Sequence, residues 1–343
     1  MRVLVAMSGG VDSSVAAALL VAEGHDVVGA TMKLWGGAGD SGCCSVGDVE
    51  DARWAAQRLG VTHHVFNFTD AFETHVVEPY AAAHAAGRTP NPCIECNRHL
   101  KFDRFLDRAL TLGFDAIATG HHARVTRHAG SFGLRRAVDV AKDQSYVLAM
   151  LGQPQLSKLL LPVGEFTKSE VRARAAEVGL GTAAKPDSQD VCFITSTGGR
   201  EAFLGTRIGL HAGRLVDTAG IEVGAVPAVE LVTVGQRRGM GGGGGQRRYA
   251  VSVDTASATV VVGTAAELAD ASVAIAPDTV SWVDVPVAPG TPVLAQASAH
   301  GRASPAVWSG DGVRWQVPQR RVAPGQTLVL YDDDRVLGAA VAA

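Results

Sequence analysis

The chain has 343 residues, of which 47% are hydrophobic and 19% charged, and its formal net charge at pH 7 is −3. This length allows two or three domains with a sizeable core, and the composition argues against extended disorder. The small net charge excludes a global basic field, so any binding of RNA has to rely on local basic patches.

The sequence opens directly on an apolar strand and contains no run of about eighteen apolar residues that could span a bilayer. We therefore expect a cytoplasmic protein without a secretion signal or a membrane span. Its five cysteines, an odd number, favour catalytic, redox or metal chemistry over a disulfide scaffold. Cys43 and Cys44 are interpreted as inert buried thiols, whereas functional roles are favoured for Cys93, Cys96 and Cys192.

The first predicted strand, residues 3–7, leads into the segment SGGVDSS and then into a helix expected over about residues 15–23. The glycines let backbone amides approach an anion, and the helix N-terminus favours negative charge at the same place. The segment lacks the GxxxxGK[ST] of a Walker A loop, so it places no lysine near terminal phosphates. The pattern predicts a phosphate cradle for a nucleotide, with an ordinary glycine turn as the alternative.

The pattern up to about residue 195 alternates strands with helices. Strands are expected at residues 27–32, 64–68 and 116–119, and helices at 49–59, from about 101 to 112, and from the capping box at Thr167 and Glu170 to Gly179. Such alternation predicts an α/β fold with a mostly parallel sheet, helices on both faces, and ligands at the carboxyl ends of the strands.

The pattern changes after about residue 200, where helices are no longer expected and short alternating runs predict small β domains. These runs lie at residues 229–234, 248–254, 258–263, 291–297 and 326–331. The five glycines at 241–245 are interpreted as a surface loop. Gln-Arg-Arg occurs at 236–238, 246–248 and 319–321; solvated surface explains each copy, but their recurrence gives modest support to phosphate contacts.

Three polar segments carry candidate chemistry. In TPNPCIECN, residues 89–97, the prolines are expected to bar a helix, and the CxxC lies just ahead of one, where thiol pKa values can fall. KDQSY, residues 142–146, is expected in front of an apolar helix, and KPDSQDVCF, residues 185–193, places Cys192 on a strand-like stretch. There is no second CxxC, which argues against structural zinc. His121 and His122 follow a strand at the ligand end, although one could equally cap it.

Together these segments resemble the tRNA-specific 2-thiouridylases, the MnmA family of PP-loop ATP pyrophosphatases. The segments that carry the resemblance are SGGVDSS, GCCS, TPNPCIECN, TGHHARV, KDQSYVL, KPDSQDVCFI, VTVGQRRGMG and APGQTLVLYD, which cover nearly the whole chain. The resemblance implies a PP-loop catalytic domain over residues 1–198, a central β-rich tRNA-contacting domain over 199–265 and a C-terminal β-barrel domain over 266–343.

The activity implied by the resemblance is replacement of the 2-oxygen by sulfur in the wobble uridine of tRNAs for Glu, Gln and Lys. ATP, with Mg²⁺, would adenylate that oxygen, and sulfur from a cysteine desulfurase or a sulfur-relay protein would displace AMP. The resemblance makes Cys192 the persulfide carrier and Cys96 the partner thiol that forms a disulfide with it. The residues implied for ATP are Ala6, Met7, Ser8, Gly9, Gly10, Val11, Asp12, Ser13, Met32 and Gly120. Those implied for the target base and tRNA are Asn91, Pro92, Cys93, Lys142, Asp143 and Gln144, with weaker support for Arg237 and Arg238.

The chain departs from the family pattern at Cys93, where many members carry an aspartate proposed to handle protons. Cys93, Cys96 and Cys192 could instead hold a [4Fe–4S] cluster, although the persulfide route is favoured as the family default. The base-contacting Arg-Tyr pair of the barrel is not evident, and His300 is placed in that region. Two other functions stay open: a redox-sensing RNA-binding protein without turnover, and a PP-loop adenylating enzyme acting on a small molecule.

Overall fold

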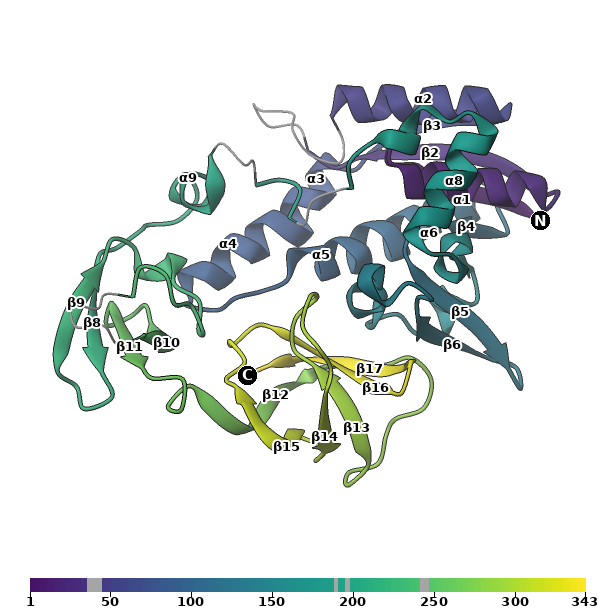
Figure 1. Ribbon diagram of the computed structural model, residues 1–343. Helices are drawn as coiled ribbons and strands as arrows, with labels where there is room; N and C mark the ends of the chain where they lie inside the picture. The colour runs from purple at the N-terminus through teal and green to yellow at the C-terminus, as the bar shows by residue number, and fades with distance from the viewer. Residues whose placement is uncertain (36–44, 188–190, 195–197, 241–246) are drawn as a thin grey trace.

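Three β-sheets organise the chain in the computed structural model, which describes residues 1–35, 45–187, 191–194, 198–240 and 247–343 (Figure 1). The predictions for Cys43, Cys44 and the glycines at 241–245 fall outside the described residues. No helix within these ranges is long and apolar enough to cross a membrane.

The N-terminal sheet is parallel and has the strand order β3-β2-β1-β4-β7. Its strands are β1 (Arg2–Ala6), β2 (Asp26–Lys33), β3 (Thr62–Asn67), β4 (Ala116–Ala118) and β7 (Leu159–Leu160). The three strands expected after the first one are therefore confirmed. Because all strands run the same way, the loops that follow them meet at one edge of the sheet.

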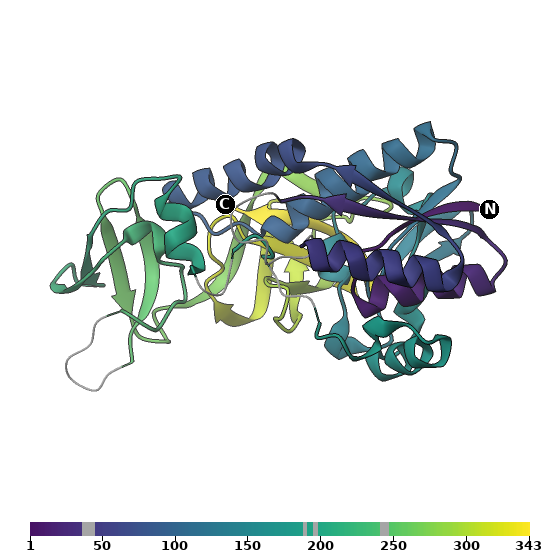
Figure 2. The ribbon, with the colours of Figure 1, turned by 90° about the horizontal axis from the view of Figure 1, so that it is seen from above.

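Helices cover both faces of this sheet, as predicted, because neighbouring residues of β1 point to opposite sides. Val3 and Val5 pack under α1 (Val11–Ala22), α2 (Val46–Leu59) and α8 (Lys168–Val178). Leu4 and Ala6 face the other layer. That layer comprises α3 (Thr69–Phe72), η1 (Glu73–Val77), α4 (Glu78–Ala85), α5 (Pro92–Glu95), η2 (Cys96–Arg104) and α6 (Phe105–Thr111). Figure 2 shows the two layers from above.

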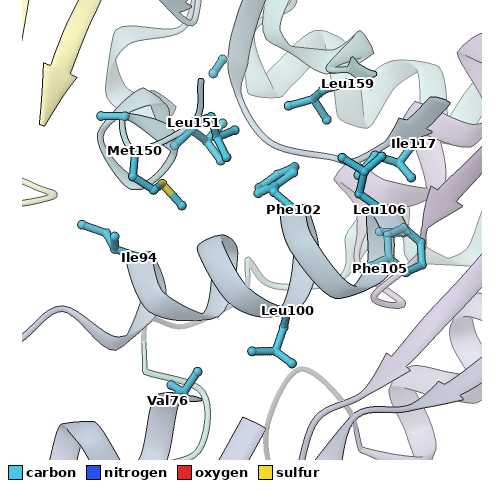
Figure 3. Close-up of a cluster of buried hydrophobic side chains, with 14 of the residues drawn as sticks. Val76, Ile94, Leu100, Phe102, Phe105, Leu106, Ile117, Met150, Leu151 and Leu159 are labelled. Atoms are coloured by element: carbon cyan, nitrogen blue, oxygen red, sulfur yellow. The ribbon is translucent and has the colours of Figure 1, made fainter. Parts of the chain in front are cut away.

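The segments α5, η2 and α6 form one continuous helix, which begins nine residues earlier than the start expected near Lys101. Pro92 does not bar this helix, because it occupies the first turn, where its missing N–H costs nothing. The Asn91 side chain caps the start by accepting from the Cys93 N–H at 3.0 Å. Figure 3 shows Phe102, Phe105 and Leu106 of this helix beside Ile117 and Leu159 of the sheet. The CxxC therefore lies inside the helix rather than ahead of it.

Other predictions of local structure were wrong: one helix starts about a turn earlier than expected, and several segments form a different type of element. Helix α1 starts at Val11 rather than Val15, because Gly10 is its N-cap. KDQSY leads not into an α-helix but through the 3₁₀ turns η3 (Val140–Lys142) and η4 (Ser145–Leu148). Residues 191–194 form turns rather than a strand, and 229–234 contain the 3₁₀ turn η7 (Val229–Leu231). A short helix, α9 (Gly199–Gly205), lies after residues 191–194, in a part of the chain where no helix was expected. The remaining short helical elements are α7 (Gln153–Leu156), η5 (Pro162–Glu165) and η6 (Gly181–Ala184).

The C-terminal strands form a closed antiparallel barrel, because β12 pairs with both β15 and β17. Its strands are β12 (Ala269–Trp282), β13 (Pro292–Gln296), β14 (Ser304–Trp308), β15 (Gly312–Arg320), β16 (Thr327–Asp332) and β17 (Arg335–Ala342). An unexpected hairpin of β5 (Ala123–His128) and β6 (Ser131–Arg136) leaves the N-terminal unit and pairs with β17. The barrel is thus hydrogen-bonded to a hairpin that follows β4 of the parallel sheet along the chain.

A small middle sheet has the order β10-β11-β8-β9 and lies at the far end of α4 (Figure 1). Its strands are β8 (Gly213–Asp217), β9 (Glu222–Val226), β10 (Tyr249–Asp254) and β11 (Thr259–Gly263). The buried His84 of α4 contacts the Glu230 carbonyl at 3.3 Å, which links the two units. The domain limits at residues 198 and 265 remain a proposal.

Candidate active site

A cavity of about 380 Å³ opens where the loops after β1, β2 and β4 meet the start of the helix at Pro92. Residues from the KDQSY segment, α8, the Cys192 turn and the barrel complete its wall. The candidate residues that line it are Ala6, Met7, Ser8, Asp12, Ser13, Met32, Gly120, Pro92, Cys93, Cys96, Lys142, Asp143, Gln144, Cys192 and His300. Gly9, Gly10, Val11 and Asn91 are not among the lining residues, and Arg237 and Arg238 are exposed on the middle segment away from it.

The conformation of the turn after β1 depends on a glycine and on hydrogen bonds within the turn. Gly9 has φ +74°, and a Cβ atom there would lie 2.2 Å from the Asp48 carbonyl oxygen of α2. The Ser13 hydroxyl accepts from the Ser8 N–H at 3.1 Å, and the Ser14 hydroxyl donates to the Gly10 carbonyl at 2.9 Å. The N-terminus of α1 therefore faces the cavity with amide groups available to an anion, as a phosphate cradle requires.

Asp12, in the first turn of α1, is held by two cationic or polar partners from other elements. Lys168 of α8 donates to both of its carboxylate oxygens at 2.8 and 2.7 Å, and His122 Nε2 lies 3.0 Å from Oδ1. Burial alone would raise the pKa of Asp12, but the hydrogen bonds from His122 and Lys168 outweigh it, so the pKa is lowered. SGGVDSS itself contains no lysine, and α8 brings Lys168 beside this turn from a distant part of the sequence.

Asp187 connects Lys168 to the segment expected to face tRNA. Its carboxylate lies 3.0 Å from Lys168, 2.8 Å from Lys142 and 2.7 Å from Arg172. Although burial opposes it, the hydrogen bonds from Lys142 and Lys168 hold the pKa of Asp187 well below its usual range. A chain of alternating charges therefore runs from Asp12 to Lys142 along the cavity wall.

Lys185 fixes the cradle against α2. Its ammonium group donates to the Gly9 carbonyl at 3.1 Å and to Asp48 at 2.7 Å, and it contacts Asp51 at 2.5 Å. Burial opposes the charged form, but bonds to Asp48 and Asp51 leave the pKa of Lys185 raised. The turn carrying Gly9 is thus tied to α2.

The segment after β4 closes the same end of the cavity. A Cβ atom on Gly120 would lie 2.5 Å from the Ser13 backbone nitrogen, so only glycine fits this approach. His121 is buried, with Nδ1 at 2.7 Å from Thr119 Oγ1 and Nε2 at 3.4 Å from Lys101 Nζ. Because lysine only donates, Nε2 accepts and Nδ1 carries the proton. Burial, together with the charges of Lys101 and His122, lowers the pKa of His121 well below its usual value.

The thiol end of the cavity is built by helix α5 and an aromatic cluster. Cys93 and Cys96 sit in the first turns of the helix, and Cys192 faces the same cavity from the 191–194 turn. Phe193 anchors that turn, with ring centroids 5.5 Å from both Phe72 and Tyr80. Val191 has φ +52°, a left-handed conformation that is unfavourable for a β-branched residue. Aromatic packing against Phe193 therefore holds a strained turn that presents Cys192.

The KDQSY segment is fastened to its surroundings from both sides. Gln144 accepts from the His122 N–H at 2.9 Å, and its own N–H donates to the His122 carbonyl at 2.8 Å. The Asp143 carboxylate is almost fully buried and pairs with Arg136 of β6 at 2.9 Å. Arg136 in turn stacks over the Tyr331 ring of the barrel at 3.7 Å. Asp143 thus has a structural bond at the barrel interface in addition to its place in the cavity wall.

Sequence reasoning missed Lys168, Asp187 and Asn97 as residues of the cavity. In the sequence, Lys168 stood out only as part of the capping box that opens a helix, and Asp187 only as part of the segment KPDSQDVCF. Asn97 is buried, its side-chain amide donates to the Val147 carbonyl at 3.1 Å, and its Oδ1 has no partner among the described residues. Its position one residue after the CxxC was the available signal.

The donor arrangement bears on the metal alternatives. Within the described ranges, no three His, Cys, Asp or Glu side chains are gathered closely enough to hold a metal ion. A [4Fe–4S] cluster holds its thiolates further apart than a single ion does, and Cys93, Cys96 and Cys192 line one cavity, so the cluster stays an alternative to the persulfide route. Mg²⁺ needs only one or two carboxylates besides phosphate oxygens, and Asp12 and Asp187 supply that number.

Comparison with known proteins adds matches along the whole chain. The family described as "tRNA methyl transferase HUP domain" matches residues 1–196, and "Aminomethyltransferase beta-barrel domain" matches 297–342. The tRNA-specific 2-thiouridylase MnmA of Acidothermus cellulolyticus is 47% identical, over 100% of this chain and 98% of that protein. The enzyme of the same name from Chloroflexus aurantiacus is 47% identical, over 98% and 97%. A solved complex of a 4-thiouridine synthetase with RNA and bound ATP is 20% identical and covers 56% of this chain and 44% of its own, with a TM-score of 0.40.

Proposed function

Because the chain belongs to the family of tRNA-specific 2-thiouridylases and forms 2-thiouridine in tRNA, we propose that the cavity described above carries both halves of that reaction. The observation that supports this is the lining itself: the SGGVDSS turn and Lys168 form one part of the wall, and Cys93, Cys96 and Cys192 another. A uridine placed between them would meet activated phosphate and sulfur without leaving the cavity.

In the first half, ATP would adenylate the C2 oxygen of the wobble uridine in tRNAs for Glu, Gln and Lys. Amides of the turn from Ala6 to Ser13 and the α1 N-terminus would hold the phosphates, with Met32 and Gly120 beside the adenosine. Lys168, already placed by Asp12 and Asp187, would face the charge that develops on the departing pyrophosphate. Mg²⁺, held by Asp12 and Asp187, would supply Lewis-acid stabilisation of the phosphates.

In the second half, Cys192 would carry the sulfur as a persulfide, whose terminal sulfur attacks C2 and displaces AMP. The Cys96 thiolate would then attack the Cys192 sulfur, which releases 2-thiouridine and forms a Cys96–Cys192 disulfide. The turn held by Phe193 supports this assignment, because it presents Cys192 to the cavity that Cys96 lines.

The remaining assignments concern tRNA and the sulfur donor. Asn91, Pro92 and Cys93 would face the target base, and Lys142 to Gln144 the flanking tRNA, with Arg237 and Arg238 on phosphates further out. His300 lines the cavity from the barrel, where it could contact the anticodon loop. A cysteine desulfurase or a sulfur-relay protein would load Cys192, and the tRNA substrate implies action in the cytoplasm.

The test is reconstitution with purified protein, ATP, Mg²⁺, a cysteine desulfurase, cysteine and a tRNA for Lys. We expect one 2-thiouridine per tRNA, with AMP and pyrophosphate formed in step, and none with a tRNA whose wobble base is cytidine. Thiouridine formed without ATP would contradict the adenylation step. ATP consumed with a small acid instead of tRNA would favour a different PP-loop activity, and RNA binding without any ATP consumption would favour a redox-sensing RNA-binding protein.

A further inference from the structure

In the proposed reaction Cys192 and Cys96 handle sulfur, whereas the third thiol of the cavity, that of Cys93, only faces the target base. Cys93 lies at the second position of the helix that begins at Pro92, and Cys96 lies three residues later. An aspartate at this position could share a proton but could not exchange with a disulfide. The reaction that a thiol can undergo here and a carboxylate cannot is thiol–disulfide exchange.

The backbone brings the side chains of Cys93 and Cys96 to the same side of the helix. The Cys96 N–H bonds to the carbonyls of both Pro92 and Cys93, so this turn has 3₁₀ as well as α character. In a 3₁₀ turn, side chains three residues apart eclipse each other, which shortens the distance between them. From Cys96 onward the helix widens into the π-helix η2, so the two thiols lie in a locally irregular turn.

Cys93 lies at the start of the helix and on the cavity that the Cys192 turn also lines. The helix N-terminus stabilises negative charge, and thiolate is the form that attacks a disulfide. The Tyr80 ring packs on Phe193, the neighbour of Cys192, with the ring centroids 5.5 Å apart. This packing holds the turn that carries Cys192 at the cavity that Cys93 lines.

We propose that Cys93 is a resolving thiol, which attacks Cys96 in the Cys96–Cys192 disulfide left by each sulfur transfer. The new bond joins the sulfurs of Cys93 and Cys96, the old Cys96–Cys192 bond breaks, and its electron pair leaves on Cys192 as a thiolate. The Cys93 proton goes to solvent, and the exchange requires no oxidant. This inference rests on the proposed persulfide route.

The three thiols would then have different roles: Cys192 accepts sulfur, and Cys93 and Cys96 hold the disulfide. Cys192 is free to accept the next sulfur while the oxidised pair stays on the helix as a Cys93–Cys96 disulfide. An external dithiol then reduces that pair and becomes a disulfide itself, which balances the two electrons. An enzyme with aspartate at this position would need the reductant to reach the Cys96–Cys192 bond instead.

The experiment is a single turnover of the full-length enzyme with disulfide mapping. Cys192 is loaded by a desulfurase and cysteine, small thiols are removed, and ATP, Mg²⁺ and tRNA are added without oxygen. Samples are quenched in acid, alkylated with N-ethylmaleimide and analysed by peptide mass spectrometry. We expect the Cys96–Cys192 disulfide to rise first and then to be replaced by Cys93–Cys96, with their sum matching the thiouridine formed.

Cys93→Ser and Cys93→Asp are the matched variants, and their disulfides are counted per mole of thiouridine. Both should lose the Cys93–Cys96 disulfide and stop at Cys96–Cys192; if one fails to fold, the other and the wild-type time course decide. Thiouridine formed by the wild type with only Cys96–Cys192 accumulating, or with Cys93–Cys192 instead, overturns the resolving role and leaves the proposed function standing. If the wild type makes no thiouridine, the proposed function fails first, and thiouridine without any cysteine disulfide rules out the persulfide route itself.

Discussion

The two ends of the cavity are built in different ways. The phosphate end comes from consecutive residues, Ser8 to Ser13, at one strand–helix turn, and ion pairs around Asp12 and Asp187 brace it. The thiol end joins two segments about a hundred residues apart and is braced by aromatic rings around Phe193. A local turn can be recognised in the sequence, whereas a site assembled by packing depends on the whole fold. Variants at the two ends should therefore lose different parts of the reaction.

Cys192→Ser should have the largest effect, because it removes the proposed sulfur carrier and leaves the phosphate end intact. We expect no detectable thiouridine, with pyrophosphate still released in a burst of about one per enzyme when tRNA and ATP are added. Quenched-flow measurement of both products checks this separation. Thiouridine made by the variant would mean that sulfur reaches the base by another route.

Asp143→Asn should be the most destabilising change, because it leaves the half-buried Arg136 guanidinium beside Tyr331 without its carboxylate partner. Breaking such a pair costs about 3–5 kcal/mol, measured as the free energy of unfolding in denaturant. Asp332→Asn is the control, since that side chain is 66% exposed and pairs with Arg335 on the surface, where about 0–1 kcal/mol is expected. Equal effects of the two changes would show that the Asp143 pair does not hold the barrel interface.

Gly9→Ala should weaken the phosphate end through the backbone. The alanine would be strained at φ +74°, and its Cβ would collide with the Asp48 carbonyl. We therefore expect the free energy of unfolding to fall by about 2–4 kcal/mol, and we expect ATP to bind more weakly. Gly24→Ala is the matched control at φ +80° with no heavy atom within 4 Å, where only about 1–2 kcal/mol of strain is expected. Calorimetry of ATP binding and thermal unfolding of both variants test this difference.

Lys168→Met should weaken ATP binding about tenfold to a hundredfold, or about 1.4–2.7 kcal/mol, because a charged partner of the phosphates is lost. Lys158→Met, an exposed lysine outside the cavity lining, is the control. Titration of ATP into each variant gives the dissociation constants. An unchanged constant for Lys168→Met would restrict that lysine to bracing Asp12.

Lys168→Met should also alter how stability depends on pH, and this effect should be smaller than those of the other changes. The pKa of Asp12 is lowered in the folded protein below its unfolded value of 3.8, so its contribution is present above that value and is lost as pH falls through the folded pKa. Without Lys168 the folded pKa rises toward the unfolded one, and the stabilisation shrinks. Unfolding temperatures between about pH 3 and pH 6 should therefore differ most from the wild type at the upper end of this range.

Much of the fold could be predicted because strong local patterns agree with it. The strands around β1, the capping box at Thr167 and the strand–turn–helix context of SGGVDSS were read correctly. The start of the helix at Pro92 was misplaced, because a proline that breaks a helix interior is favourable in its first turn. The 229–234 segment was misread as a strand, since a short apolar run does not distinguish a strand from a buried turn. The β5–β6 hairpin gave no signal that it would pair with β17.

By itself, the sequence determined the glycine turn between β1 and α1, the alternation that makes a parallel sheet, and the residue types at the thiol end. Those features depend on neighbours within a few residues, where glycine conformations, helix ends and periodicity act. Only the tertiary structure decided that Lys168 would stand beside Asp12, that Asp143 would be buried against Arg136, and that Phe193 would carry Cys192 to the helix of Cys93. Those contacts join residues up to 156 positions apart, and packing and charge pairing choose them once the chain has closed.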